Sequence, residues 1–228
     1  MAADLQAAIV DLDGTMVDTL GDFELAIGAA FADLGLPRPP REFIARTIGK
    51  GSEHLIRSCL ANVGADAGRA EAAWQRYQHH YLLVNGRHAD IYPGVVEGLQ
   101  RLAEAGLRLA CLTNKPTAFA LPLLARKGLR QRFAVVFGGD AFANKKPHPE
   151  PLLRCCEALG TMPARTLMIG DSSNDALAAR AAGCPVVLVS YGYNHGEPVT
   201  AVDADAVIDR LDELDRRWLP PSRASGLR

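Results

Sequence analysis

The stretch AAIVDLDGT, residues 7–15, decides the fold. Four apolar residues, Ala7 to Val10, are too few for a helix and end directly at Asp11, a pattern typical of a short buried strand. Gly14 permits the tight exit that the chain needs after such a strand. Asp11 and Asp13 are separated by one residue. This spacing fits a solvated turn as well as a functional site at the end of a strand.

The same pattern recurs along the rest of the chain. Apolar runs that end in polar residues or glycine lie at residues 109–112, 134–137, 167–169 and 186–189. Helical patterns, each followed by a glycine, lie at residues 95–104, 118–127, 150–159 and 175–182. Alternating strands and helices predict an α/β fold with a doubly wound, mostly parallel sheet.

Residues 17–85 break this alternation because they contain no clear strand run. Their helical patterns are interrupted by Gly35, the Pro37–Pro40 segment, Gly49 and Gly64. We expect an inserted all-α cap of about four helices. The predicted division is a core of residues 1–16 and 86–219, a cap of residues 17–85, and a flexible tail of residues 220–228.

Composition narrows the class of protein. The 228 residues include 25 Lys and Arg against 26 Asp and Glu, a net charge of −1 that argues against nucleic acid as a partner. No run of about 18 apolar residues predicts a membrane span. The first residues lack a basic segment, and the five cysteines form no CxxC pair. We expect a cytoplasmic protein with free thiols, either a monomer or a homodimer.

Polar residues occur at three more junctions between a predicted strand and the helix that follows it. They are Thr113 and Asn114, then Lys145 and Lys146 before a proline-rich helix start, and the segment Gly170 to Asp175. Each has an ordinary explanation: Thr113 suits a helix N-cap, the lysines suit solvent, and Asp and Ser suit caps. Parallel strands, however, end at one edge of the sheet. Together these residues describe one pocket that suits Mg²⁺ and a phosphate group.

Four motifs in this order resemble those of the haloacid dehalogenase-like hydrolase superfamily: DLDGT (11–15), LTN (112–114), KKPHPEP (145–151) and GDSSND (170–175). The inserted helices resemble the C1-type cap of that superfamily, whose core is Rossmann-like. The stretch SYGYNHGEP at 190–198 is similar to that of bacterial phosphoglycolate phosphatases.

The resemblance implies a role for each matching residue. Asp11 is the nucleophile that forms an aspartyl phosphate, and Asp13 is the general acid and base. The implied Mg²⁺ ligands are Asp11, the backbone carbonyl of Asp13, and Asp171. Thr113 and Asn114 hold the transferring oxygens, Lys146 supplies a fixed positive charge, and Asp175 supports Lys146 or the water shell of the metal.

The implied reaction is hydrolysis of a phosphate monoester, with 2-phosphoglycolate as the expected substrate. Its small carboxylate needs a cation from the cap, for which we select Lys50 between two glycines, with Arg41 and Arg46 as weaker candidates. Lys50 could equally lie on the surface. The motifs are also compatible with a small sugar-phosphate phosphatase, a phosphotransferase like β-phosphoglucomutase, and a phosphate-binding protein without turnover.

Overall fold

A six-stranded sheet forms the centre of the computed structural model, which describes residues 4–215 and 217–219. The strands run in the order β5-β4-β1-β6-β7-β8, and every neighbouring pair in this sheet is parallel. Their bounds are β1 (Ala7–Val10), β4 (Arg108–Leu112), β5 (Val135–Phe137), β6 (Thr166–Gly170), β7 (Val186–Val189) and β8 (Ala206–Ile208). The predicted doubly wound fold is confirmed. The predicted tail, 220–228, lies outside the described residues.

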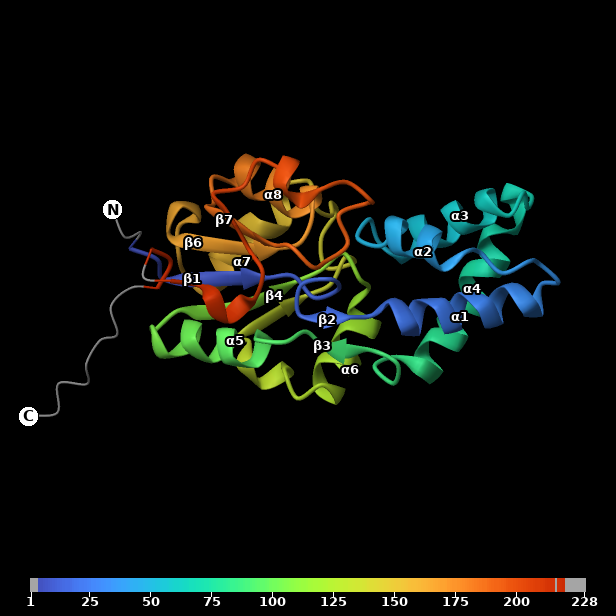
Figure 1. Ribbon diagram of the computed structural model, residues 1–228, viewed down its shortest axis with the longest axis horizontal. Coiled ribbons are helices and arrows are strands. Elements are labelled where there is room, and N and C mark those ends of the chain that lie inside the picture. The colour runs from blue at the N-terminus through green and yellow to red at the C-terminus, as the bar shows by residue number, and fades with distance from the viewer. Residues whose placement is uncertain (1–3, 216, 220–228) are drawn as a thin grey trace, which may run out of the picture.

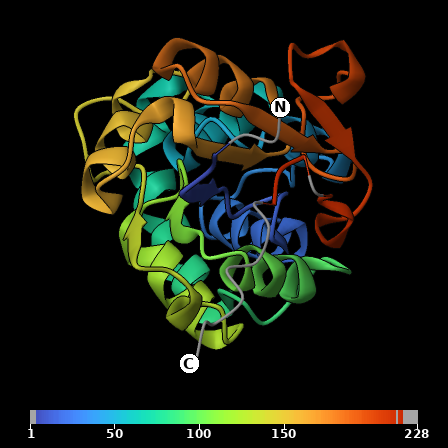
Figure 2. The same ribbon diagram turned by 90° about the vertical axis from the view of Figure 1, so that its left-hand side faces the viewer.

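Helices cover both faces of the sheet (Figures 1 and 2). Helices α5 (Val95–Glu104) and α6 (Thr117–Arg126) pack on one face, and α7 (Glu150–Leu159) and α8 (Ser173–Ala182) on the other. Successive residues of β1 point to opposite faces, so Ala8 and Val10 join the first cluster and Ala7 and Ile9 the second. All four are fully buried. Packing from both sides therefore fixes the end of β1, where Asp11 follows.

Four helices lie beyond the carboxyl end of the sheet, on the right in Figure 1: α1 (Leu20–Asp33), α2 (Arg41–Thr47), α3 (Ser52–Asn62) and α4 (Ala70–Val84). They share a hydrophobic cluster of their own, which includes Phe31, Ile44, Leu60 and Tyr77. Because the cluster is largely separate from those of the sheet, these helices form a distinct layer. We keep 17–85 as the proposed bounds of the cap.

Two short strands join this cap to the core. Strand β2 (Val17–Asp18) pairs antiparallel with β3 (Asp90–Ile91). The expectation that residues 17–85 contain no strand was therefore wrong at their first two residues, because two residues are too few to show a period. Just beyond β2, the buried carboxylate of Asp22 accepts hydrogen bonds from the backbone N–H groups of Gly86 and His88, at 2.5 and 2.8 Å. Asp22 thus ties the two connections together.

The other differences from the sequence prediction are small. Strand β8 was not predicted, although its three residues are all apolar; unlike the central strands, they alternate between half-buried and exposed. Helices α6 and α8 begin one and two residues earlier than expected, at Thr117 and Ser173. Five single-turn 3₁₀ helices complete the elements: η1 (Ala67–Arg69), η2 (Arg130–Arg132), η3 (Pro163–Arg165), η4 (Val199–Ala201) and η5 (Leu211–Glu213).

Two further expectations concern compartment. In the described part of the chain, no helix has the length and apolar character that crossing a bilayer requires. All five cysteines are buried and free, as expected.

We expect Asp22→Ala to lower the free energy of unfolding by about 2–3 kcal/mol, because the backbone N–H groups of Gly86 and His88 lose their acceptor. Asp22→Asn keeps one acceptor oxygen and should lose less. The measurement is urea unfolding followed by circular dichroism, with Asp203→Ala on the surface as control. An Asp22→Ala variant as stable as the control would contradict this role for Asp22.

Candidate active site

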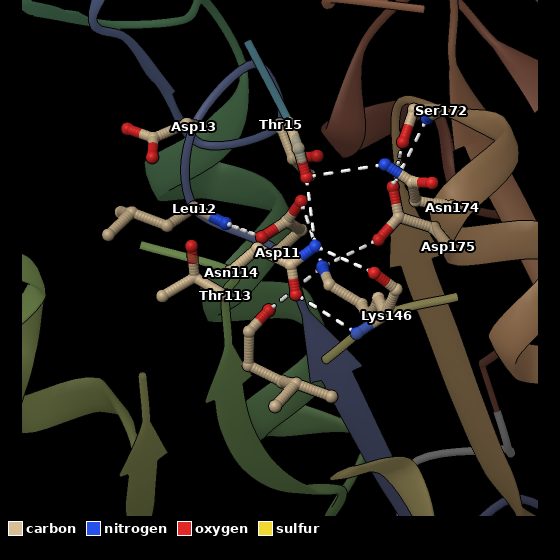
Figure 3. Close-up of polar contacts among 12 residues, drawn as sticks. Asp11, Leu12, Asp13, Thr15, Thr113, Asn114, Lys146, Ser172, Asn174 and Asp175 are labelled. Atoms are coloured by element: carbon tan, nitrogen blue, oxygen red, sulfur yellow. Dashed lines mark hydrogen bonds and ion pairs between the residues drawn. The ribbon is translucent and has the colours of Figure 1, made fainter. Parts of the chain in front are cut away.

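The predicted motifs meet at the carboxyl edge of the sheet, facing the cap (Figure 3). Asp11 and Asp171 directly follow β1 and β6, and Thr113 follows β4. Lys146 comes from the loop before α7. All four residues are buried, with at most 8 % of their surface exposed. Neighbouring strands with matching ends therefore assemble in space what the sequence spreads over 160 residues.

Lys146 is the cation at the centre of this site. Its Nζ lies 2.9 Å from Asp11 Oδ2 and 2.7 Å from Asp175 Oδ1, and it donates to the carbonyl oxygen of Leu112 at 3.2 Å. Only 2 % of its side chain is exposed. Three acceptors match the three N–H groups of an ammonium group, so Lys146 has one fixed position. The neighbouring Lys145 is exposed.

Asp175 orients Lys146 and also begins helix α8. Its Oδ2 accepts hydrogen bonds from the backbone N–H groups of Asp171 and Ser172 and from the Ser172 hydroxyl, at 3.2, 3.1 and 2.9 Å. Ser172 is the N-cap of α8, and the two residues form a capping box. The capping and functional interpretations of this segment are therefore compatible, since one oxygen of Asp175 serves each.

Asp171 is held from two sides. Its Oδ1 accepts a hydrogen bond from the Thr15 hydroxyl at 2.7 Å, and its Oδ2 accepts one from the backbone N–H of Tyr193 at 2.6 Å. The chain passes very close at Gly14, where φ is +83° and an added Cβ would lie 2.2 Å from Asp171 Oδ2. Glycine is therefore required at position 14 both for the turn and for the close contact with Asp171.

Burial and crowding set the protonation of the carboxylates. Loss of solvent raises the pKa of Asp11 to about 7, although the positive charge of Lys146 opposes the rise. Burial, together with the charges of Asp175 and Asp11, raises the pKa of Asp171 well above its usual value. Burial alone would lower the pKa of Lys146, but the carboxylates of Asp11 and Asp175 outweigh that effect and raise it. The site thus holds more negative charge than its lysine neutralises.

A divalent cation fits this arrangement. Asp11, Asp171 and Asp175 each offer a buried oxygen, and these oxygens lie within 4.8 Å of one another. Three carboxylates against one lysine leave a formal charge of −2 (−3 + 1). Oxygen ligands of this kind suit a hard cation. Asp11 and Asp171 directly follow the paired strands β1 and β6, so these two carboxylates are placed side by side at the edge of the sheet where a metal would bind.

The side chain of Asp13 points away from this cluster, toward the cap (Figure 3). Both of its oxygens contact Lys115 Nζ, at 2.9 and 3.0 Å, and its Oδ1 accepts a hydrogen bond from the Thr19 hydroxyl at 2.8 Å. The resemblance implied that Asp13 acts as general acid and base for the reaction at Asp11. Here its carboxylate is paired with Lys115 and lies apart from the Asp11 carboxylate.

The motif after β4 differs partly from expectation. Thr113 is not a helix N-cap, because α6 begins at Thr117 after Pro116. Its hydroxyl accepts a hydrogen bond from the backbone N–H of Lys115 at 3.1 Å, and the residue lines the pocket. Thr113 therefore shapes the loop on which Asn114 and Lys115 lie.

Asn114 is used within the protein. Its Nδ2 donates to the carbonyl oxygens of Gly49 and Lys146, at 2.9 and 2.8 Å, and its Oδ1 accepts from the backbone N–H of Lys146 at 3.0 Å. Asn174 Nδ2 also donates to the Gly49 carbonyl, at 3.2 Å. Asn114 thus positions Lys146, and both asparagines bind the cap loop to the core.

A narrow pocket lies between cap and core, and its cavity volume of about 20 Å³ is little more than one water molecule needs. It is lined by Asp11, Asp13, Phe23, Ile48, Gly49, Gly51, Ser52, Leu55, Thr113, Asn114 and Lys115.

The pocket lining does not include the cap cations predicted to read the substrate. Lys50 is exposed, Arg41 pairs with Glu24 on the surface, and Arg46 lines a different hollow beside Gly196. The structure supports the surface interpretation of Lys50.

Sequence reasoning gave no role to three residues that complete the site. Lys115 directly follows Thr113 and Asn114, so the strand-end signal that found those two also applied to it. Thr15 lies within the first motif and binds Asp171. Tyr193 acts through its backbone N–H, which no sequence pattern reports.

Comparison with known proteins agrees with this site. The family model described as haloacid dehalogenase-like hydrolase matches residues 8–189. A phosphoglycolate phosphatase of Thiobacillus denitrificans is 44 % identical over 212 residues, covering 92 % of this chain and 93 % of its own. A plasmid-encoded phosphoglycolate phosphatase of Cupriavidus necator is 44 % identical over 216 residues, covering 94 % and 93 %.

A solved structure is also similar. The crystal structure of "a predicted phosphoglycolate phosphatase" from Haemophilus somnus superposes with a TM-score of 0.88 at 31 % identity, covering 92 % of this chain and 96 % of its own. Fold and site define a hydrolase with an aspartate at the end of its central strand. The chain belongs to the haloacid dehalogenase-like hydrolase family.

The raised pKa of Asp11 predicts how stability depends on pH when no divalent cation is present. The folded-state pKa is about 7 and the unfolded value about 3.9. In between, the folded state keeps a proton that the unfolded chain has released, so the free energy of unfolding falls as pH rises.

We therefore expect wild type to lose roughly 2–3 kcal/mol between pH 5 and 7 relative to Asp11→Asn, which has no titrating group there. The measurement is urea unfolding in EDTA at several pH values. Parallel pH profiles of the two proteins would contradict the raised pKa of Asp11.

Proposed function

We propose that this protein hydrolyses phosphate monoesters through an aspartyl phosphate on Asp11, and that its substrate is 2-phosphoglycolate, which yields glycolate and phosphate. The observation that carries the chemistry is the buried contact of 2.9 Å between Lys146 and Asp11, next to Asp171 and Asp175. The names of relatives 44 % identical over most of the chain support the substrate.

The buried acids also support a metal cofactor, for which we propose Mg²⁺. Asp11, Asp171 and the backbone carbonyl of Asp13 would hold it, with Asp175 occupied by Lys146. When bound, Mg²⁺ neutralises the charge of the phosphate and lets it approach an anionic nucleophile. A hard cation with carboxylate ligands matches this donor set.

The residues of the chain divide the reaction into two steps. A carboxylate oxygen of Asp11 bonds to phosphorus as the bond from phosphorus to the ester oxygen breaks, and Asp13 gives a proton to the departing alkoxide. Asp13 then takes a proton from water, which attacks phosphorus and releases phosphate from Asp11. Throughout, Lys146 balances charge on Asp11 and the phosphoryl oxygens.

The narrowness of the pocket between cap and core, with a cavity volume of about 20 Å³, supports a small leaving group. The buried free cysteines support a cytoplasmic location. We also keep the proposal that the protein is a monomer or a homodimer.

The first test is kcat/KM for phosphate release with Mg²⁺ across a substrate panel. We expect 2-phosphoglycolate to exceed sugar 1- and 6-phosphates and nucleoside monophosphates by at least about tenfold, or about 1.4 kcal/mol in the transition state. Asp11→Asn serves as the blank because it removes the nucleophile. Asp33→Asn, on the surface of the cap, is the matched control.

Three results would each point to a different function. A flat profile or a sugar-phosphate preference would contradict the substrate while leaving the Asp11 chemistry in place. Transfer of phosphate to a second sugar hydroxyl, in place of release to water, would support a phosphotransferase. Binding of phosphate without turnover of any ester would support a non-enzymatic role.

A further inference from the structure

Lys115 is a buried cation for which the proposed chemistry has no use. It follows β4 on the core, and only 2 % of the residue is exposed. Among the residues that the structure describes, it is the one cationic side chain in the pocket lining. Lys146 is already paired with Asp11 and Asp175, so the two buried lysines have different ion partners.

The cap holds the ammonium group of Lys115 in place. Its Nζ lies 4.3 Å from the ring centre of Phe23 on α1 and 4.7 Å from that of Tyr81 on α4. Both rings belong to the buried cluster of the cap. Aromatic faces attract a cation and leave its N–H groups available to anions. Lys115 is therefore a core residue whose surroundings come from the cap.

The anion that Lys115 binds in this structure is a side chain of the pocket itself. Asp13 offers both carboxylate oxygens, at 2.9 and 3.0 Å, in the arrangement of a bound carboxylate. This contact holds the proposed acid away from Asp11, as the orientation of Asp13 in Figure 3 shows. For Asp13 to reach the ester oxygen, Lys115 needs another partner, since burying an unpaired charge is costly.

The proposed substrate carries such a partner. In 2-phosphoglycolate one methylene group and the ester oxygen separate the carboxylate from the phosphorus, so its two anionic ends are close enough to face Asp11 and Lys115, which line the same pocket. The phosphate end belongs beside Asp11 and Lys146. The carboxylate end then lies on the side lined by Phe23, Leu55 and Lys115, where the lysine is the available cation.

We propose that Lys115 binds the carboxylate of the leaving group and so determines specificity, with the substrate carboxylate replacing Asp13 as its ion partner. This inference rests on the proposed function, since it requires a substrate with a carboxylate. The exchange leaves Asp13 free to turn toward the ester oxygen. A substrate without the second anion would leave Asp13 paired with Lys115, so recognition and the supply of the acid are coupled.

The test compares two pairs of small molecules on wild type and Lys115→Met. The substrates are 2-phosphoglycolate and 2-hydroxyethyl phosphate, in which a hydroxymethyl group replaces the carboxylate. The inhibitors are 3-phosphonopropionate, a stable analogue of 2-phosphoglycolate, and propylphosphonate, which lacks the carboxylate. We expect Lys115→Met to raise the Ki of 3-phosphonopropionate about 100-fold and that of propylphosphonate less than threefold.

For turnover, kcat/KM should fall about 100-fold or more with 2-phosphoglycolate, and much less with 2-hydroxyethyl phosphate. Each ratio is taken within one protein preparation, so partial misfolding of Lys115→Met cannot imitate the result. Lys145→Met removes an exposed lysine near the same pocket and is the matched control, with both Ki values within twofold of wild type.

Several outcomes would overturn the inference. Equal losses for ligands with and without the carboxylate would reduce Lys115 to a structural partner of Asp13. Unchanged Ki values in Lys115→Met would show that Lys115 does not bind the carboxylate. A higher Ki for 3-phosphonopropionate alone in Lys50→Met or Lys145→Met would assign carboxylate recognition to that exposed lysine instead. Wild type without preference for 2-phosphoglycolate over 2-hydroxyethyl phosphate would refute the proposed substrate, and this inference with it.

Discussion

Three carboxylates and one ammonium group are buried together at the carboxyl edge of the sheet, and their unequal charge constrains everything around them. Lys146 can neutralise one of the acids that surround it. The remainder costs free energy in the absence of another cation, as the raised pKa values of Asp11 and Asp171 show. The cluster persists because β1 and β6 are packed on both faces, and because Asp175 is tied to the start of α8. The fold thus maintains an acidic site that a divalent cation and a phosphate group complete.

The same edge of the sheet also controls the cap. Tyr193 uses its backbone N–H to hold Asp171, while its hydroxyl accepts hydrogen bonds from the N–H groups of Thr19 and Leu20 where α1 begins, both at 3.1 Å. On the other side, Asn114 and Asn174 share the carbonyl oxygen of Gly49. Tyr193 holds the cap near its connection to the core, and the two asparagines hold it at the loop that contains Gly49. The position of the cap therefore depends on residues of the acidic site and its neighbours.

Much of this arrangement could be predicted from the sequence, for a physical reason. Buried parallel strands are short apolar runs, and their polar ends must meet at one edge, so Asp11, Thr113 and Asp171 could be placed together without coordinates. The sequence could not decide between the two interpretations of Lys50, because a lysine between glycines looks the same whether it points into a pocket or into solvent. Lys115 was missed because its burial depends on Phe23 and Tyr81, which are 92 and 34 residues away along the chain (115 − 23 and 115 − 81). Contacts of that range follow from the packing of cap on core, which no local pattern describes.

The two buried lysines explain how one pocket can treat the two anionic ends of a small phosphate ester differently. Lys146 is surrounded by carboxylates of the core and has no N–H group to spare, so it sets the charge around Asp11 regardless of what the ester carries. Lys115 lies against aromatic rings of the cap, and its partner Asp13 has one further hydrogen bond, from Thr19, so an incoming anion can displace it. The fixed lysine therefore belongs to the phosphoryl chemistry proposed for Asp11. Lys115, whose partner can be exchanged, determines which substrates are selected. Because Lys115 also holds Asp13, a substrate that fails to displace Asp13 is not supplied with the acid, so discrimination does not depend on binding affinity alone.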